Sequence, residues 1–275
     1  MENVVDFLSI QGNIGAGKSY VFGAIKKYIA THGLCVLTAP LEYANHDGKG
    51  RDLFLVVDEP VGEWCEEKHS LLNCDGEGDD AQMYSYLGLF YKGMDMEKYG
   101  KINPFAFDFQ VNTFSSRAEN LDTQLAKIRA FSPESGTRVH VISERSLRTD
   151  RLFFKNVYES GNVPQHQWHN YERIYRVVCA EKLKREDAML YVKTSPEMCY
   201  HRIHHKRKRE GESTIPLEYL ESLDVQHDHM IKEFKSSNGE ESVTTLHLER
   251  DISPSEIETI AASLMRCKHA QSLSA

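Results

Sequence analysis

The first residues that could do chemistry form the stretch GNIGAGKS, which runs from Gly12 to Ser19 behind the apolar run VVDFLSI. Their spacing, Gly-x-x-x-x-Gly-Lys-Ser, is that of a phosphate-binding loop. Glycine lets the backbone curl until successive N–H groups point into one cavity, and the positive end of the following helix adds to their field. Lys18 can then contact the β- and γ-phosphates of a nucleotide, while the Ser19 hydroxyl can bind Mg²⁺.

This loop predicts binding of ATP or GTP but leaves the reaction open. The alternative is a Gly-rich turn without a ligand, which would not need Lys and Ser in this register. The predicted phosphate-binding residues are Gly12, Asn13, Ile14, Gly15, Ala16, Gly17, Lys18, Ser19 and Tyr20.

A second motif, LFLVVDEPVGEW, spans residues 53–64. In one interpretation, Asp58 and Glu59 end the strand of a motor ATPase, and Glu59 polarises a hydrolytic water. In the other, Glu59 is a general base toward an acceptor hydroxyl beside the phosphates. Pro60 stops the strand and Trp64 can form the wall of a pocket, which favours the second interpretation.

Charged side chains also follow two later apolar runs. Glu144, after residues 139–143, could hold Mg²⁺ through water, and Arg145 could hold phosphate or orient Glu59. After residues 188–192 comes CYHRIHHKRKREGESTIPLEYL, whose basic residues indicate a mobile lid over a transferring phosphoryl group. A solvated basic face is the alternative.

These side chains need a framework that brings them together, and the apolar pattern supplies one. Near-continuous apolar runs that alternate with helical stretches predict a parallel sheet buried on both faces, whose carboxyl edge binds ligands. The expected strands are 4–10, 34–40, 53–57, 139–143, 188–192 and 243–248. The expected helices are 18–31, 105–130, 150–160, 165–184, 196–210, 216–235 and 253–268.

Composition excludes several classes of protein. The net charge of −8 over 275 residues argues against a general nucleic-acid binder, and the sequence has no run of 18 apolar residues that would predict a membrane span. Glu2 and Asp6 occupy the place of a basic leader, and the six cysteines form no CxxC pair. We therefore expect a cytoplasmic enzyme of one domain that binds neither nucleic acid nor membrane.

Taken together, the motifs resemble the deoxyribonucleoside kinase family, in the branch of deoxycytidine, deoxyguanosine and multisubstrate kinases. The matching stretches, in the order of the family, are GNIGAGKS, VVDEPVGEW, FAFDFQ, ISERSLRTDR, YVKTSPEMCYHRI, RKREGESTIPLEYL and LDVQHDHMI. The resemblance covers residues 4 to about 250. It implies a P-loop fold with a five-stranded parallel sheet, helices on both faces and a basic helical lid.

The resemblance also implies roles for single residues. Glu59 would take the proton from the sugar 5′-hydroxyl, Arg145 would steady that carboxylate and the phosphate, and Gln110 would read the nucleobase. Tyr99, eleven residues before Gln110, would contact the 3′-hydroxyl. The other residues with implied roles are Glu212, which would share that hydroxyl, the lid arginines Arg207 and Arg209, and the pocket residues Trp64 and Phe105.

Two features depart from the family pattern. The strand that should carry the catalytic carboxylate reads LCVLTAP, with Ala39 where Glu would sit, and EPVGEW comes twenty residues later. We therefore expect insertions near 40–52 and 66–90 within a single kinase domain of residues 1–275. The lid, expected at about 202–214, has Gly211 in place of the first of two glutamates.

The resulting hypothesis is a deoxyribonucleoside kinase for nucleotide salvage that transfers the γ-phosphoryl group of ATP, with Mg²⁺ held by Ser19 and Glu144. Arg117 and Asp150 would form a charge pair that disfavours thymidine relative to deoxycytidine or purine deoxynucleosides. The long helices would pair across a homodimer. The alternatives are a motor-type or regulatory NTPase and a non-catalytic nucleotide-binding subunit of the same fold.

Overall fold

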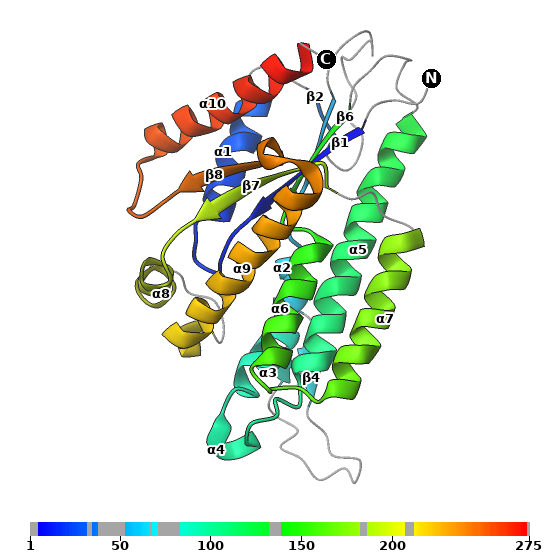
Figure 1. Cartoon of the computed structure of the whole chain (residues 1–275), viewed down its shortest axis with the longest axis vertical. Helices are drawn as coiled ribbons and strands as arrows, with labels where there is room; N and C mark the ends of the chain where they lie inside the picture. Colours follow the sequence, from blue (N-terminus) through cyan, green and yellow to red (C-terminus); the bar gives the residue numbers. More distant parts are fainter. Residues whose placement is uncertain are drawn as a thin grey trace.

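Six strands pair in parallel to form the central sheet, in the order β2-β3-β6-β1-β7-β8 (Figure 1). The computed structural model describes residues 5–31, 35–37, 53–66, 68–70, 83–131, 139–181, 186–206 and 212–273. The strands are β1 (Val5–Gln11), β2 (Cys35–Leu37), β3 (Leu53–Val57), β6 (Val139–Glu144), β7 (Ala188–Lys193) and β8 (Val243–His247).

The register of the three neighbouring strands β3, β6 and β1 aligns their carboxyl ends. Val57 of β3 pairs with Ser143 of β6, and Ile10 of β1 pairs with Glu144. The residues that follow each strand therefore meet at one edge of the sheet, as expected for a parallel α/β ligand site. This edge receives the glycine loop, the Asp58–Glu59 pair and Arg145.

The helices form two groups beside the sheet (Figure 1). On one side, α1 (Lys18–Thr31) packs against α10 (Pro254–Leu273). On the other, α6 (Leu147–Glu159) contacts α5 (Ala106–Phe131), α7 (Gln165–Glu181) and α9 (Leu217–Asn238). The helix α8 (Pro196–His205) packs against α9. The strong amphipathic pattern of α6 explains its place, because it buries Leu147, Leu152, Phe154 and Val157.

Several short elements stand between β3 and α5. They are α2 (Val61–Glu66), the antiparallel pair β4 (Lys68–Ser70) and β5 (Met83–Ser85), α3 (Tyr86–Lys92) and α4 (Met96–Tyr99). Ser85 caps α3, because its hydroxyl accepts from the backbone N–H of Gly88 at 2.9 Å. Two turns of 3₁₀ helix, Glu212–Thr214 and Glu240–Ser242, flank α9.

The predicted fold class is confirmed: a parallel sheet with helices on both faces carries a phosphate loop between β1 and α1. All six expected strands are present, so the sheet has one strand more than the five that the family resemblance implies; of the expected strand 34–40, residues Cys35–Leu37 form β2 at the edge beside β3. Residues 38–52, which contain the whole first predicted insertion, lie outside the described residues, as do residues 71–82 of the second insertion and residues 207–211 of the predicted lid.

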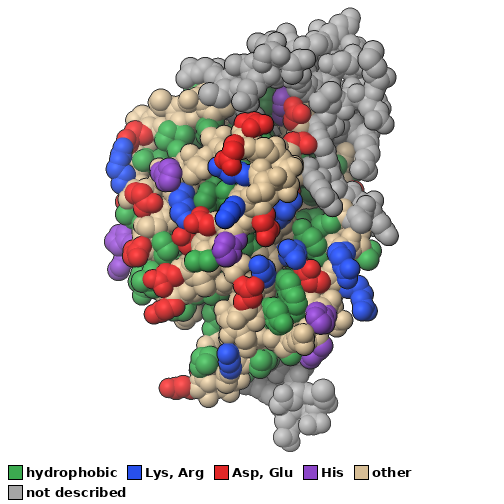
Figure 2. All heavy atoms as spheres, in the orientation of Figure 1, with side chains coloured by type: hydrophobic (Ala, Val, Ile, Leu, Met, Phe, Trp, Pro, Cys, Tyr) green, Lys and Arg blue, Asp and Glu red, His purple; other side chains and the backbone are tan. Residues whose placement is uncertain are grey.

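Acidic and basic side chains are interspersed over the described part of the face in Figure 2, so the acidic excess is not gathered in one patch there. Among the described helices, none has the length and apolar character needed to cross a membrane. Among the described residues, Cys65, Cys179 and Cys199 form no disulfide bond.

Candidate active site

The glycine loop closes tightly between β1 and α1. Gly12 has a φ of +149°, and a Cβ there would lie 2.5 Å from the carbonyl oxygen of Val192, so a larger residue does not fit. Lys18 is buried, and its Nζ donates to the carbonyl oxygen of Asn13 at 2.7 Å. Burial, together with the positive charge of Arg145, lowers the pKa of Lys18 to about 7. A phosphate group at this place would restore the charge of the ammonium.

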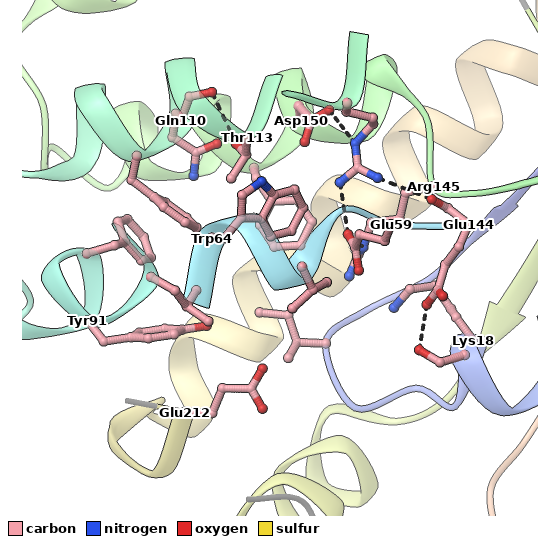
Figure 3. Close-up of a pocket in the computed structure, with 18 of the residues that line it drawn as sticks. Lys18, Glu59, Trp64, Tyr91, Gln110, Thr113, Glu144, Arg145, Asp150 and Glu212 are labelled. Carbon is pink, nitrogen blue, oxygen red and sulfur yellow. Dashed lines mark hydrogen bonds and ion pairs between the residues drawn. The ribbon is translucent and has the colours of Figure 1, made fainter. Parts of the chain in front are cut away.

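The two acidic residues after β3 point in different directions. Asp58 is exposed and pairs with Lys26 at 2.8 Å, whereas Glu59 lines the buried cavity shown in Figure 3. Oε1 of Glu59 lies 2.8 Å from Nη2 of Arg117 and 3.2 Å from Nε of Arg145. Burial raises the pKa of Glu59, but Arg117 and Arg145 outweigh it and hold the pKa at about 2. Glu59 is therefore an anion at neutral pH.

The backbone of Arg145 adopts an unusual conformation. Its φ of 65° is positive, its N–H donates to the carbonyl oxygen of Ile10 at 3.0 Å, and its carbonyl accepts from the Ser143 hydroxyl at 2.6 Å. The guanidinium lies 4.7 Å from the centre of the Phe153 ring. A strained backbone conformation is common at functional sites, where the neighbouring residues hold a side chain in one direction. Here the Arg145 side chain lines the cavity.

Ser19 and Glu144 are the residues available for a metal ion. The Ser19 hydroxyl donates to Oε1 of Glu144 at 2.6 Å, so both oxygens already lie together beside Lys18. Mg²⁺ takes oxygen ligands and is held at such sites by one or two protein groups plus phosphate oxygens and water. The pair therefore fits Mg²⁺. No cluster of three or more His, Cys, Asp or Glu side chains suited to a metal occurs in the described part of the chain.

Arg117 and Asp150 form a buried ion pair, with Nε of Arg117 2.7 Å from Oδ2 of Asp150. Arg117 comes from α5 and Asp150 from the first turn of α6. Burial raises the pKa of Asp150 to about 6 although Arg117 lowers it. The Asp150 carboxylate is thus largely ionised at neutral pH, because the Arg117 guanidinium offsets part of the effect of burial.

The cavity extends from these groups to Gln110. In Figure 3, Gln110 lies at one end and Lys18 at the other, with Glu59 and Arg145 nearer to Lys18. The Gln110 amide is buried, and no described residue hydrogen-bonds to it. A second cavity shares Lys18 and Ser19 with the first and is also lined by Gly15, Gly17, Tyr20, Arg202, Lys206, Leu248, Asp251 and Ile252. Two ligands could therefore meet at Lys18.

The structure brings most of the predicted site residues to the first cavity. Those that line it are Ile14, Lys18, Ser19, Glu59, Trp64, Gln110, Arg117, Glu144, Arg145, Asp150 and Glu212. Tyr99 and Phe105 do not line it and instead pack against each other, with ring centres 5.6 Å apart. Arg207 and Arg209 lie outside the described residues.

Sequence reasoning missed several residues of the cavity wall, namely Val61, Leu87, Phe90, Tyr91, Phe109, Thr113, Phe153 and Tyr219. Phe109 and Thr113 lie one residue before and three residues after Gln110 on α5, so helical periodicity could have found them. Tyr91 lies in the last turn of α3, a helix that no pattern in the sequence predicted. It is Tyr91, not Tyr99, that lines the cavity.

Comparison with known proteins agrees with this arrangement. A family model described as deoxynucleoside kinase matches residues 48–266. Deoxycytidine kinase of Homo sapiens is 30% identical over 224 residues, which cover 80% of this chain and 73% of that protein. Deoxycytidine kinase 2 of Gallus gallus is 28% identical over 230 residues, which cover 82% and 74%.

Other relatives match over a shorter length or in fold. The mitochondrial thymidine kinase 2 of Homo sapiens is 34% identical, but over only 91 residues, or 33% of this chain and 34% of that protein. The structure of deoxyadenosine kinase from M. mycoides with bound dCTP superposes with a TM-score of 0.58 at 23% identity, covering 94% of this chain and 99% of that one. The extent of the family match and the order of the strands lead to one conclusion: the chain belongs to the deoxynucleoside kinase family.

Proposed function

We propose that the chain transfers the γ-phosphoryl group of ATP to the 5′-hydroxyl of a deoxynucleoside, and that it favours deoxycytidine or purine deoxynucleosides over thymidine. The observation that carries the proposal is the position of Glu59, a carboxylate only 12% exposed, in a cavity that contains Lys18 near one end and Gln110 at the other. A proton acceptor, a phosphate anchor and a nucleobase reader would then share one chamber, as nucleotide salvage requires.

Glu59 would accept the proton of the 5′-hydroxyl. Both arginines contact its Oε1, and no described residue hydrogen-bonds to Oε2, which leaves that oxygen for the substrate. In phosphoryl transfer most of the catalysis comes from positioning and charge, so a carboxylate of low pKa can serve by orienting the hydroxyl and taking its proton late.

Lys18 and Arg145 would stabilise the charge that develops on the transferring phosphoryl group. Both side chains are buried, so their fields are weakly screened by water. Ser19 and Glu144 would hold Mg²⁺, which bridges phosphate oxygens and neutralises charge when bound. The donor nucleotide would occupy the second cavity, with its phosphates at Lys18.

Gln110 would bind the nucleobase edge with its amide oxygen and nitrogen, and Trp64 and Phe153 would line the base pocket. The sugar would lie near Glu212 and Tyr91, because both line the cavity and Tyr99 does not. We therefore propose Tyr91 in the role that the sequence had indicated for Tyr99.

The thymidine preference is argued from the buried Arg117–Asp150 pair. The pair would narrow the end of the cavity where a thymine methyl group must sit, and Asp150 could accept from an exocyclic amino group. A contact of this kind discriminates by roughly 1–3 kcal/mol, or about 10- to 200-fold. We expect Arg117→Met/Asp150→Ala to raise kcat/KM for thymidine by at least about tenfold relative to deoxycytidine.

The test measures transfer of labelled phosphate from ATP to thymidine, deoxycytidine, deoxyadenosine and deoxyguanosine, in the natural chain and in the double variant. Thymidine as the best substrate of the natural chain, or no relative gain for thymidine in the variant, would refute the preference. Hydrolysis of ATP without transfer to any of the four would refute the proposed reaction.

The alternative functions find no support. Asp58 is exposed and paired with Lys26, so the Asp-Glu pair does not present two carboxylates to one site as the motor interpretation would use them. A non-catalytic subunit would tolerate loss of Lys18, Glu59 or Arg145, and the chain retains all three. Arg207 and Arg209 remain our candidates for the lid.

We also propose that the whole chain is one kinase domain that forms a homodimer through its long helices and acts in the cytoplasm. The helix α7 supports the dimer, because it exposes Ile174 (37%) and Val177 (52%). The free thiols of the described cysteines fit a reducing compartment. Cell fractionation with an antibody to the chain tests the location, and a membrane-enclosed fraction would contradict it.

A further inference from the structure

Arg117 contacts both Asp150 and Glu59, which have different roles in the proposed function. Its Nε donates to Asp150 at 2.7 Å, its Nη2 donates to Glu59 at 2.8 Å, and its Nη1 donates to the carbonyl oxygen of Glu144 at 3.2 Å (Figure 3). One guanidinium therefore reaches from the carboxylate that would read the nucleobase to the carboxylate that would accept the proton. The side chain is 7% exposed, so these contacts are made with little competition from water.

On Glu59, Arg117 and Arg145 contact the same oxygen, Oε1. Arg145 alone can therefore keep the carboxylate oriented when Arg117 is absent. Each guanidinium also stabilises the carboxylate anion and makes it a weaker proton acceptor. The other charged groups that face Glu59 are Lys18 from α1 and, as acidic neighbours of the arginines, Asp150 and Glu144.

We propose that Arg117 is a positioning residue that acts through Glu59: it restrains the proton acceptor, and so limits the rate of transfer while it helps to select the nucleobase. The inference rests on the proposed function, because it takes Glu59 as the base. Its physical ground is that general bases act best when their pKa lies near the working pH, whereas two ion pairs keep the pKa of Glu59 far below it. Removing one pair strengthens the base at little loss of orientation.

The proposal makes a prediction that base selection alone does not make. If Arg117 only shaped the nucleobase end of the cavity, its removal would raise the activity with thymidine. The rate of transfer to deoxycytidine would then stay the same or fall. If it restrains Glu59, Arg117→Met speeds the transfer step for deoxycytidine as well, by about threefold or more. The gain must disappear when Glu59 is no longer a carboxylate, because coupled residues are not additive.

The experiment is a double-mutant cycle on the single-turnover rate of transfer to saturating deoxycytidine, which excludes effects of product release. Arg117→Met and Arg117→Lys are each measured with Glu59 and with Glu59→Gln. We expect a rise with Met, a smaller rise with Lys because it keeps a cation near Glu59, and changes below about twofold for both in the Glu59→Gln background. Misfolding lowers a rate, so it cannot produce the rise.

Asp150→Ala is the matched control, because it removes the other carboxylate partner and leaves Arg117 on Glu59. It is expected to give no rise in the transfer rate. An equal rise in both Glu59 backgrounds, an equal rise with Asp150→Ala, or a fall with Arg117→Met would each overturn the inference. If the single variant Glu59→Gln transferred phosphate as fast as the natural chain, the assignment of Glu59 as the base would be wrong instead. A failure of the proposed function and a failure of this inference therefore show up in different variants.

Discussion

At the scale of single residues, Lys18 carries a charge state that depends on its ligand. Burial and the neighbouring Arg145 bring its pKa down to about 7 in the structure, so at pH 8 most of the amine is neutral. The phosphates of a bound nucleotide would favour the ammonium and raise this pKa again. Nucleotide binding should therefore take up a proton, and the amount should depend on pH.

We predict uptake of about one proton on ATP binding at pH 8 and much less at pH 6, where Lys18 is already charged. Titration calorimetry in buffers of different ionisation enthalpy measures this number. Lys26→Met, an exposed lysine on the same helix, is the control and should leave the uptake unchanged. Equal uptake at both values of pH would show that Lys18 does not titrate in this range.

The residues of the site were predictable where the motif itself fixes the spacing. The glycine loop, Glu59 after its strand and Arg145 after Glu144 all depend on positions within one motif, and each lines a cavity. Tyr99 depended instead on counting back from Gln110 through a region with an expected insertion. Tyr99 does not line the cavity, whereas Tyr91, eight residues earlier, does. Counting residues back across a loop of unknown length cannot identify the residue that occupies a given place in the site.

At the scale of elements, the helix α9 contains an ionisable side chain in its buried face. His227 is fully buried, and its Nδ1 lies 2.7 Å from the carbonyl oxygen of Leu223, so Nδ1–H donates to that oxygen. Burial lowers the pKa of His227 to about 3, and Arg145 adds to the shift. The unfolded chain binds a proton at this residue below about pH 6.5, whereas the folded chain does so only near pH 3.

The sign follows from linkage: between pH 6.5 and 3 the unfolded state binds more protons, so stability falls as the pH falls. At pH 5, His227 should account for a loss of about 2 kcal/mol relative to pH 7.5. Chemical denaturation of the natural chain and of His227→Gln at both values of pH measures this loss. His229→Gln, an exposed histidine on the same helix, should keep it; an identical loss in His227→Gln would exclude His227 as its source.

Helices and strands could be predicted where the sequence has a strong apolar pattern. Where that pattern is interrupted, the sequence left the secondary structure ambiguous. The runs at 53–57 and 188–192 became β3 and β7, because a strand buried on both faces must be apolar throughout. The helices α2, α3 and α4 have four to seven residues, too few to show helical periodicity in sequence. The packing of α2 and α3 against α5 and each other, which forms one wall of the cavity, is set by tertiary contacts.

At the scale of the whole molecule, the exposed face of α7 is the feature that the monomer does not explain. Ile174 and Val177 are three residues apart and so lie on the same side of the helix. We predict that Ile174→Glu/Val177→Glu weakens self-association at least about tenfold, because each lost apolar contact costs about 1.5–3 kcal/mol. Light scattering after size exclusion measures the mass across a dilution series.

Val225→Glu is the matched control for this prediction, because Val225 is equally exposed (52%) but lies on α9. It should leave the mass unchanged. A natural chain that is monomeric throughout the series would contradict the homodimer, and a dimer that survives the α7 substitutions would place its interface elsewhere.

The account depends most on Glu59, since both arginines contact its carboxylate and the proposed acceptor hydroxyl would bind there. The most direct measurement compares kcat and the ATP dissociation constant in the natural chain, in Glu59→Gln and in Asp58→Asn, the exposed neighbouring carboxylate. We predict that Glu59→Gln lowers kcat by about 10²-fold or more while ATP affinity changes little, and that Asp58→Asn changes neither. Natural kcat in Glu59→Gln, or a larger loss in Asp58→Asn, would contradict the assignment of the base.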